Sequence, residues 1–204
     1  MKNWKKYSAF LSLGEWHIHT NYTDGDNSID AYCEKAMELG IPLIAFTEHV
    51  RQKLNYDFDA FLEEIDNARE QYDLIILSGC ETKVFPDGSL DVDENILKQV
   101  DYPIYAFHSF PKNIITYLNV LHAVMKNPHV NTWAHPIEYL ERNEFNIPKD
   151  ELTRLFKALR DNEVLLELNI KYGALPDEWI DLARRYKVDI VRGSDIHRVK
   201  DMKK

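Results

Sequence analysis

The 204-residue chain has little cysteine, no long apolar run, and fewer basic than acidic residues. Its two cysteines, Cys33 and Cys80, are too few and too far apart for a disulfide scaffold or a cysteine-based zinc site, and they favour a reducing, cytoplasmic setting. No apolar stretch approaches the ~20 residues that a membrane-spanning helix needs. Lysine and arginine number 25 against 34 aspartates and glutamates, and the resulting formal charge of −9 makes nucleic acid an unfavourable partner.

The chain contains no linker, low-complexity tract or internal repeat, so we predict a single domain over residues 1–204. A composition of 45% hydrophobic and 12% aromatic residues is typical of a globular fold with a core large enough for an enzyme pocket. The stretch Tyr7–Leu13 follows a basic start as in a signal peptide, but it runs into Glu15 without a small-residue cleavage signal. We interpret it as a solvated lead-in to the first strand.

Short apolar runs alternate with segments of helical periodicity along the chain. Seven runs are candidate strands: Glu15–Thr20, Leu43–Thr47, Leu74–Gly79, Pro103–Phe107, Val130–Ala134, Val164–Asn169 and Asp189–Gly193. Apolar stripes at helical spacing predict helices between them: Ile29–Ala36, Phe58–Ile65, Leu152–Leu159 and Trp179–Tyr186. This alternation predicts an α/β fold in which helical crossovers join parallel strands, and seven such strands favour a closed barrel over an open sheet.

Histidines and carboxylates recur at or just after the ends of six candidate strands. They are His17 with His19, His49, Glu81, His108, His135, and Asp195 with His197. Residues two apart lie on one face of a strand, so His17 and His19 are expected to point the same way. Because the carboxyl ends of barrel strands converge on one mouth, these side chains are expected to meet there. Imidazoles with a few carboxylates predict a site for zinc, manganese or iron.

Three other residues of these chemical types are predicted to be structural. His122 lies among the apolar residues of a helical segment, and His129 lies in a turn after Pro128. Cys80 should point to the opposite face from Glu81 if the strand continues, which favours a core residue over a nucleophile.

Taken together, these motifs resemble the PHP family, named for its polymerase and histidinol phosphatase members. The matching segments are His17-Ile18-His19-Thr20-Asn21-Tyr22-Thr23-Asp24-Gly25, Thr47-Glu48-His49, Gly79-Cys80-Glu81, Phe107-His108-Ser109, Ala134-His135-Pro136 and Ser194-Asp195-Ile196-His197. They follow the family's order along almost the whole chain. The stretch Glu81–Leu90 is most similar to the PHP domains attached to family X DNA polymerases.

The resemblance implies a distorted (β/α)7 barrel of the PHP type that holds two or three divalent ions. It implies three ligand sets: His17, His19, Glu81 and Asp195; Glu81, His108 and His135; and Asp24, His49 and His197. Asp24 is expected to be a ligand only because of this resemblance, since the residues Thr23-Asp24-Gly25 by themselves indicate a turn. Asp195 and His197 are the candidate catalytic residues, and the sequence leaves open whether Asp195 orients the nucleophile as well as binding metal.

A site of this kind predicts a metal-dependent phosphatase or phosphoesterase acting on a small phosphorylated metabolite. Two ions ~3.5–4 Å apart ionise a bridging water and neutralise the charge that builds on the phosphoryl oxygens. Three cations near the predicted mouth are candidates for binding the substrate phosphate: Arg51, Lys83 and Arg198.

Alternative hypotheses stay open. The polymerase-like stretch favours a 3′–5′ nuclease, although the net charge of −9 argues against it. Histidinol phosphate is another candidate substrate, although the barrel is short for that branch. An amidohydrolase would commonly have a lysine where His108 stands, and a non-catalytic metal-binding module would be expected to have lost ligands.

The chain ends seven residues after His197, where PHP domains usually continue into a helix, so the first residues or a second copy of the chain would cover that side.

Overall fold

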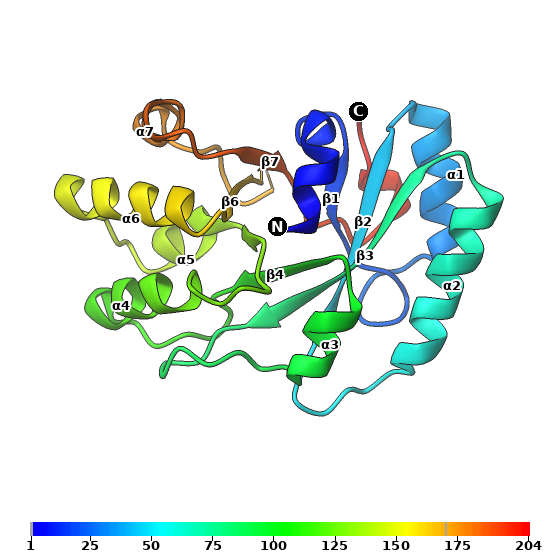
Figure 1. Ribbon diagram of the computed structural model, residues 1–204, viewed down its shortest axis with the longest axis horizontal. Helices are drawn as coiled ribbons and strands as arrows, with labels where there is room; N and C mark the ends of the chain where they lie inside the picture. The colour runs from blue at the N-terminus through cyan, green and yellow to red at the C-terminus, as the bar shows by residue number, and fades with distance from the viewer. Residues whose placement is uncertain (1, 170) are drawn as a thin grey trace.

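The computed structural model describes residues 2–169 and 171–204, and its centre is a barrel of parallel strands (Figure 1). Seven strands pair with one another in chain order. They are β1 (Glu15–Ile18), β2 (Leu43–Val50), β3 (Ile75–Lys83), β4 (Tyr102–Ala106), β5 (Thr132–Trp133), β6 (Leu165–Leu168) and β7 (Ile190–Arg192). A parallel bridge between Ile18 and Ile196 joins β1 to the segment that follows β7, so the barrel is nearly closed. The predicted seven-stranded α/β barrel is confirmed.

Helices connect the strands and cover the outside of the barrel. They are α1 (Ile29–Leu39), α2 (Phe58–Gln71), α3 (Glu94–Gln99), α4 (Ile114–Val124), α5 (Pro136–Arg142), α6 (Lys149–Asp161) and α7 (Asp177–Tyr186). Figure 1 shows α1 and α2 beside β2 and β3, with α4 to α6 on the opposite side of the molecule. The four predicted apolar stripes lie in α1, α2, α6 and α7, where they form the buried faces.

Strands β2 and β3 are longer than the sequence predicts. They extend to Val50 and Lys83, beyond the predicted ends at Thr47 and Gly79. His49 and Glu81 therefore lie inside these strands rather than after them. Eight paired positions between β2 and β3 place His49 directly opposite Glu81, so the two strands carry both side chains into the mouth at the same height.

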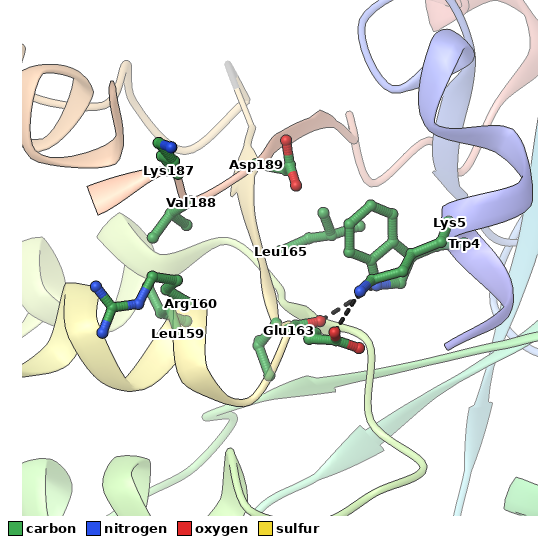
Figure 2. Close-up of a pocket in the computed structure, with 10 residues that line it drawn as sticks. Trp4, Lys5, Leu159, Arg160, Glu163, Leu165, Lys187, Val188 and Asp189 are labelled. Carbon is green, nitrogen blue, oxygen red and sulfur yellow. Dashed lines mark hydrogen bonds and ion pairs between the residues drawn. The ribbon is translucent and has the colours of Figure 1, made fainter. Parts of the chain in front are cut away.

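The N-terminal end of the barrel is closed by the 3₁₀ helix η1 (Asn3–Phe10). Trp4 and Leu11 are buried in an apolar cluster with residues from the beginnings of the strands, such as Leu165 and Val191. The Trp4 indole N–H donates to the carbonyl oxygen of Glu163 at 3.2 Å (Figure 2). The prediction of a solvated lead-in was wrong in part, because Leu11 is buried and Tyr7 and Phe10 pack partly against this cluster, whereas Leu13 is exposed.

The side of the barrel beyond β7 is covered by both ends of the chain. The backbone N–H of Arg192 donates to the carbonyl oxygen of Leu11 at 2.8 Å. After the short 3₁₀ helix η2 (Val199–Asp201), Met202 is buried in the main core. The expectation that the first residues help to cover this side is met. Among the described residues, each helix is too short or too polar to cross a lipid bilayer.

Replacing Trp4 tests the role of η1. Trp4→Ala is expected to lower the free energy of unfolding by about 3 kcal/mol, because a large buried ring leaves a cavity at the closed end of the barrel. Leu13→Ala is the matched control, since Leu13 is 56% exposed, and its effect should stay within about 0.5 kcal/mol. Urea denaturation measures both, and equal midpoints for the two variants would contradict the packing role.

Candidate metal centre

Nine histidine and carboxylate side chains converge at the carboxyl ends of the strands. They are His17, His19, Asp24, His49, Glu81, His108, His135, Asp195 and His197. These are the nine positions that the sequence singles out as ligands. They form four overlapping groups in which the possible ligand atoms all lie within 4.8 Å of one another.

Glu81 occupies the middle of the cluster and is only 1% exposed. Its Oε1 lies 3.0 Å from Nε2 of His108 and 2.8 Å from Nε2 of His135. Its Oε2 faces the other way and lies 3.5 Å from Nε2 of His19 and 3.0 Å from Nδ1 of His49. One carboxylate thus contacts imidazoles from strands on both sides of it.

An inner group is formed by His17, His19 and Asp195. His17 lies in β1 and His19 directly after its end, and the two imidazoles point the same way, as predicted, with their Nε2 atoms 3.1 Å apart. Oδ1 of Asp195 lies 3.6 Å from Nε2 of His17 and 3.2 Å from Nε2 of His19. All three side chains are buried.

An outer group is formed around Asp24, whose side chain is 54% exposed. Its carboxylate oxygens lie 3.3 Å from Nε2 of His49 and 3.3 Å from Nε2 of His197. Nδ1 of His19 is 3.9 Å from the same carboxylate, so His19 lies between the inner and outer groups. The structure therefore brings Asp24 to the cluster, which the residues alone did not predict.

The donor set fits divalent metal ions. Nδ1 of His19, Nδ1 of His49 and Oε2 of Glu81 are buried and have no aligned hydrogen-bond partner among the described residues. Buried polar atoms are normally satisfied, so three such atoms in one cluster of nitrogen and oxygen donors are best explained by ligation. Imidazole nitrogens and carboxylate oxygens suit zinc, manganese and iron.

Burial and neighbouring carboxylates move the pKa values of the imidazoles in opposite directions. Burial lowers the pKa of His19 to about 4. Burial also lowers the pKa of His49, but hydrogen bonds with Asp24 and Glu81 outweigh it and raise the value to about 10. Burial also lowers the pKa values of His17, His135 and His197, but the neighbouring carboxylates outweigh burial, so these pKa values are raised.

The central and outer carboxylates are held in the charged form. Burial raises the pKa of Glu81, but hydrogen bonds with His108 and His135 and the other imidazoles outweigh it and hold the pKa well below its usual range. Hydrogen bonds with His197 and His49 likewise keep the pKa of Asp24 far below its ordinary value. Anionic carboxylates are the form that binds metal ions.

Three buried carboxylates that the sequence analysis missed lie behind the cluster. Glu167 of β6 accepts from Nδ1 of His17 at 2.7 Å, as expected for a carboxylate that orients a metal-binding histidine. Glu15 accepts from the backbone N–H and the hydroxyl of Ser194, both at 2.8 Å, and Glu48 accepts from the backbone N–H of Thr20 at 2.8 Å. Burial raises the pKa values of Glu15 and Glu48 to about 7. The sequence offers a signal for two of them: Glu15 lies two residues before His17, and Glu48 directly precedes His49.

Asp195 is fixed from the side opposite to the histidines. Its Oδ2 accepts from Nζ of Lys171 at 2.8 Å and from the hydroxyl of Tyr172 at 2.6 Å. Its backbone is in the left-handed region, with φ of 49°, as is that of His135, with φ of 31°. Such conformations are strained for residues with a side chain and concentrate at functional sites.

Gly193 gives Glu167 the room that it needs. A Cβ atom at this position would lie 2.1 Å from Oε1 of Glu167, the oxygen that contacts His17. Only glycine leaves space here for the carboxylate behind the inner histidine.

The three candidate phosphate-binding cations lie at the ends of mouth strands but do not contact the cluster. Arg198 is half exposed, with Nε 2.7 Å from Asp201. Lys83 has its Nζ 5.6 Å from the ring centre of Phe85, and Arg51 is 3.7 Å from Asp91. Each has a partner outside the nine-residue cluster.

The three residues predicted to be structural lie outside the cluster. Nε2 of His122 pairs with Glu151 at 2.7 Å, and His129 lies 3.7 Å from Glu94. Cys80 is buried in the apolar core, and both cysteines are free. These three predictions are confirmed.

Comparisons with known proteins agree on one family. The family model described as PHP domain matches residues 15–171. The DNA polymerase/3′-5′ exonuclease PolX of Bacillus subtilis is 29% identical, over 93% of this chain and 35% of its own length. The chain thus spans about a third of that relative. A protein of Clostridium novyi named a probable phosphatase is 25% identical, over 88% of this chain and 78% of its own.

A solved structure shares the fold. Histidinol phosphate phosphatase from Lactococcus lactis, complexed with zinc, L-histidinol and phosphate, superposes with a TM-score of 0.66. It is 20% identical, and the match covers 93% of this chain and 88% of that chain.

Metal binding at the outer group is expected to release protons. His49, with its pKa raised to about 10, is protonated at neutral pH and must lose its proton to ligate, so the apparent affinity should rise as the pH increases from about 6 to about 9. Calorimetric titration with Mn²⁺ in two buffers of different ionisation enthalpy measures the release. His122→Ala is the control and should release as many protons as the wild type. An identical heat in both buffers would refute the prediction.

Proposed function

The chain belongs to the PHP domain family, and we propose that it is a metal-dependent phosphatase that hydrolyses a small phosphorylated metabolite. The observation that carries this proposal is the cluster of nine histidine and carboxylate side chains, three of whose atoms are buried without an aligned hydrogen bond among the described residues. Relatives named probable phosphatases that match this chain over most of their own length support it.

We infer three ion positions from the family resemblance, and the contacts within the cluster support them. His17, His19, Glu81 and Asp195 would hold the first ion, and Glu81 with His108 and His135 would hold the second. The outer group of Asp24, His49 and His197 would hold a third. Bound divalent ions supply Lewis acidity, which acidifies a water molecule near neutral pH and neutralises charge on the phosphoryl oxygens. Zinc, manganese and iron all suit these donors.

Asp195 and His197 are the proposed catalytic residues. Lys171 and Tyr172 fix one oxygen of Asp195 while the other faces the inner histidines, so the carboxylate is preorganised to orient an attacking water. Nδ1 of His197 lies 3.0 Å from the carbonyl oxygen of Asp195, and its Nε2 lies 3.3 Å from Oδ1 of the half-exposed Asp24. These contacts fix the imidazole beside the more exposed part of the cluster, which supports its role.

A 3′–5′ nuclease is the second candidate function, because the PolX relative carries that activity in its name. The formal charge of −9 makes this the weaker candidate, since a nucleic-acid track requires clustered basic residues. Histidinol phosphate is a substrate to test on the strength of the Lactococcus neighbour.

We place the enzyme in the cytoplasm, where two buried free thiols stay reduced, and a homo-oligomer stays a prediction.

Hydrolysis of p-nitrophenyl phosphate tests the proposal. Metal-free protein is expected to be inactive and to gain activity with Mn²⁺ or Zn²⁺. His17→Ala and Asp195→Ala should lower kcat/KM by about 1,000-fold, because removing a ligand forfeits several kcal/mol of charge stabilisation. His122→Ala, which alters a histidine outside the cluster, should keep the wild-type rate.

Two outcomes would decide against the proposal. Wild-type protein that binds metal but shows no turnover on aryl phosphates or on a panel of phosphorylated metabolites would favour the non-catalytic module. Faster release of nucleotides from single-stranded DNA than of phosphate from mononucleotides would favour the nuclease.

Arg198 is expected to bind the substrate phosphate. Its guanidinium is 50% exposed and directly follows His197, and a guanidinium can donate two parallel charged hydrogen bonds to a phosphate. Arg198→Ala should therefore raise KM by about tenfold or more with a smaller change in kcat. Arg184→Ala on α7, where the side chain is 76% exposed, is the control. An unchanged KM for Arg198→Ala would remove it from the site.

A further inference from the structure

The buried carboxylates behind the cluster are not among the proposed metal ligands, so their role needs a separate explanation. We propose that Glu48 is a positioning residue that holds the loop carrying Asp24 and thereby controls the outer ion position separately from the inner one. This inference rests on the proposed function, because it requires that ions bind to the cluster.

Glu48 binds both ends of the short segment that precedes Asp24. The side chain is fully buried in β2, where Oε1 accepts from the backbone N–H of Thr20 at 2.8 Å. Oε2 accepts from the hydroxyl of Thr23. One carboxylate thus joins the residue that leaves β1 to the residue next to Asp24.

The segment between these two contacts is a tight turn. The carbonyl oxygen of Thr20 accepts from the N–H groups of Thr23 at 3.1 Å and Gly25 at 2.9 Å. A Cβ atom at Gly25 would lie 2.2 Å from the carbonyl oxygen of His19, so the chain passes directly over the end of β1. The turn has little freedom as long as Thr20 stays in place.

Asp24 itself has few restraints. Its side chain is 54% exposed, and its close contacts are the imidazoles with which it would share an ion and the hydroxyl of Thr23, 3.4 Å from Oδ1. Packing does not hold this carboxylate, so its position depends on the turn and on the contacts that Glu48 makes with the turn.

Glu48 does not serve as a ligand. Successive residues of a strand point to opposite sides, so His49 faces the cluster while Glu48 faces away from it. Both carboxylate oxygens are engaged by Thr20 and Thr23, and Glu48 is absent from the groups whose donor atoms converge. Its hydrogen bonds therefore lead to the loop rather than to an ion.

Glu15 provides the internal comparison. It is also fully buried, and it binds the N–H and hydroxyl of Ser194, the residue before Asp195. The two carboxylates therefore support different loops. Loss of Glu48 should affect the position at Asp24, and loss of Glu15 should affect the position at Asp195.

The test is titration of metal-free protein with Mn²⁺, followed by equilibrium dialysis and calorimetry, with the thermal midpoint of each metal-free variant measured in parallel. Glu48→Ala should weaken one ion by about 10–100-fold, the usual effect of removing an outer-shell carboxylate, and leave the other ions within about threefold. Thr23→Val, at a partly exposed position, removes the hydroxyl that donates to Glu48 and with it the 3.4 Å contact with Asp24, and it should weaken the same ion less because the contact of Glu48 with Thr20 remains. It also decides the question if Glu48→Ala fails to fold.

Two further variants separate positioning from general stabilisation. Glu48→Gln should rescue the outer ion, because the amide oxygen can accept from the N–H of Thr20 while its NH₂ donates to the hydroxyl of Thr23. Glu15→Ala should weaken a different ion from Glu48→Ala, with Asp24→Asn identifying which transition belongs to the outer position.

The outcomes distinguish the inference from its premise. Wild-type protein that binds no Mn²⁺ would overturn the proposed function and the inference with it. Wild-type protein that binds ions, with Glu48→Ala and Thr23→Val binding them equally well, would overturn the inference alone. So would a loss spread evenly over all ions with a lowered thermal midpoint, which would show that Glu48 only stabilises the fold.

Discussion

The mouth of the barrel is organised around one buried carboxylate. Glu81 is almost fully removed from water, a position that is strongly unfavourable for an isolated negative charge. Imidazoles from β1, β2 and the ends of β4 and β5 surround it and keep it anionic. Each strand that supplies one of these imidazoles must end level with Glu81 for the contact to form. The anionic state of Glu81 therefore depends on the pairing register of the barrel strands.

The two ends of the barrel have opposite chemistry. Apolar side chains and η1 fill the N-terminal end, while histidines and carboxylates fill the carboxyl end. Behind these polar groups lies a further layer of buried carboxylates, Glu15, Glu48 and Glu167, which contact the loops and imidazoles of the cluster. Left-handed backbone at His135 and Asp195 adds local strain at the same end. The apolar end therefore stabilises a fold whose other end is built for ligation.

Family membership and fold narrow the chemistry without naming a substrate. The relatives include a DNA polymerase/3′-5′ exonuclease and a protein named a probable phosphatase, each matched over most of this chain. What differs among enzymes of one fold is the group of side chains around the mouth. In this chain the half-exposed cations Arg51 and Arg198 pair with Asp91 and Asp201 outside the cluster, and a role for them in substrate choice stays a prediction.

The order of elements, the barrel and eight of the nine cluster residues could be predicted from local patterns, because alternation and strand-end position are properties of neighbouring residues. Asp24 needed the family resemblance, since a turn aspartate carries no local sign of ligation. Glu15, Glu48 and Glu167 were missed because a buried acid in a strand looks like any other until its partners are known. Thr20 becomes a partner of Glu48 through the pairing of β1 with β2, and Ser194 and His17 become partners of Glu15 and Glu167 only through closure of the barrel, which joins segments up to 179 residues apart.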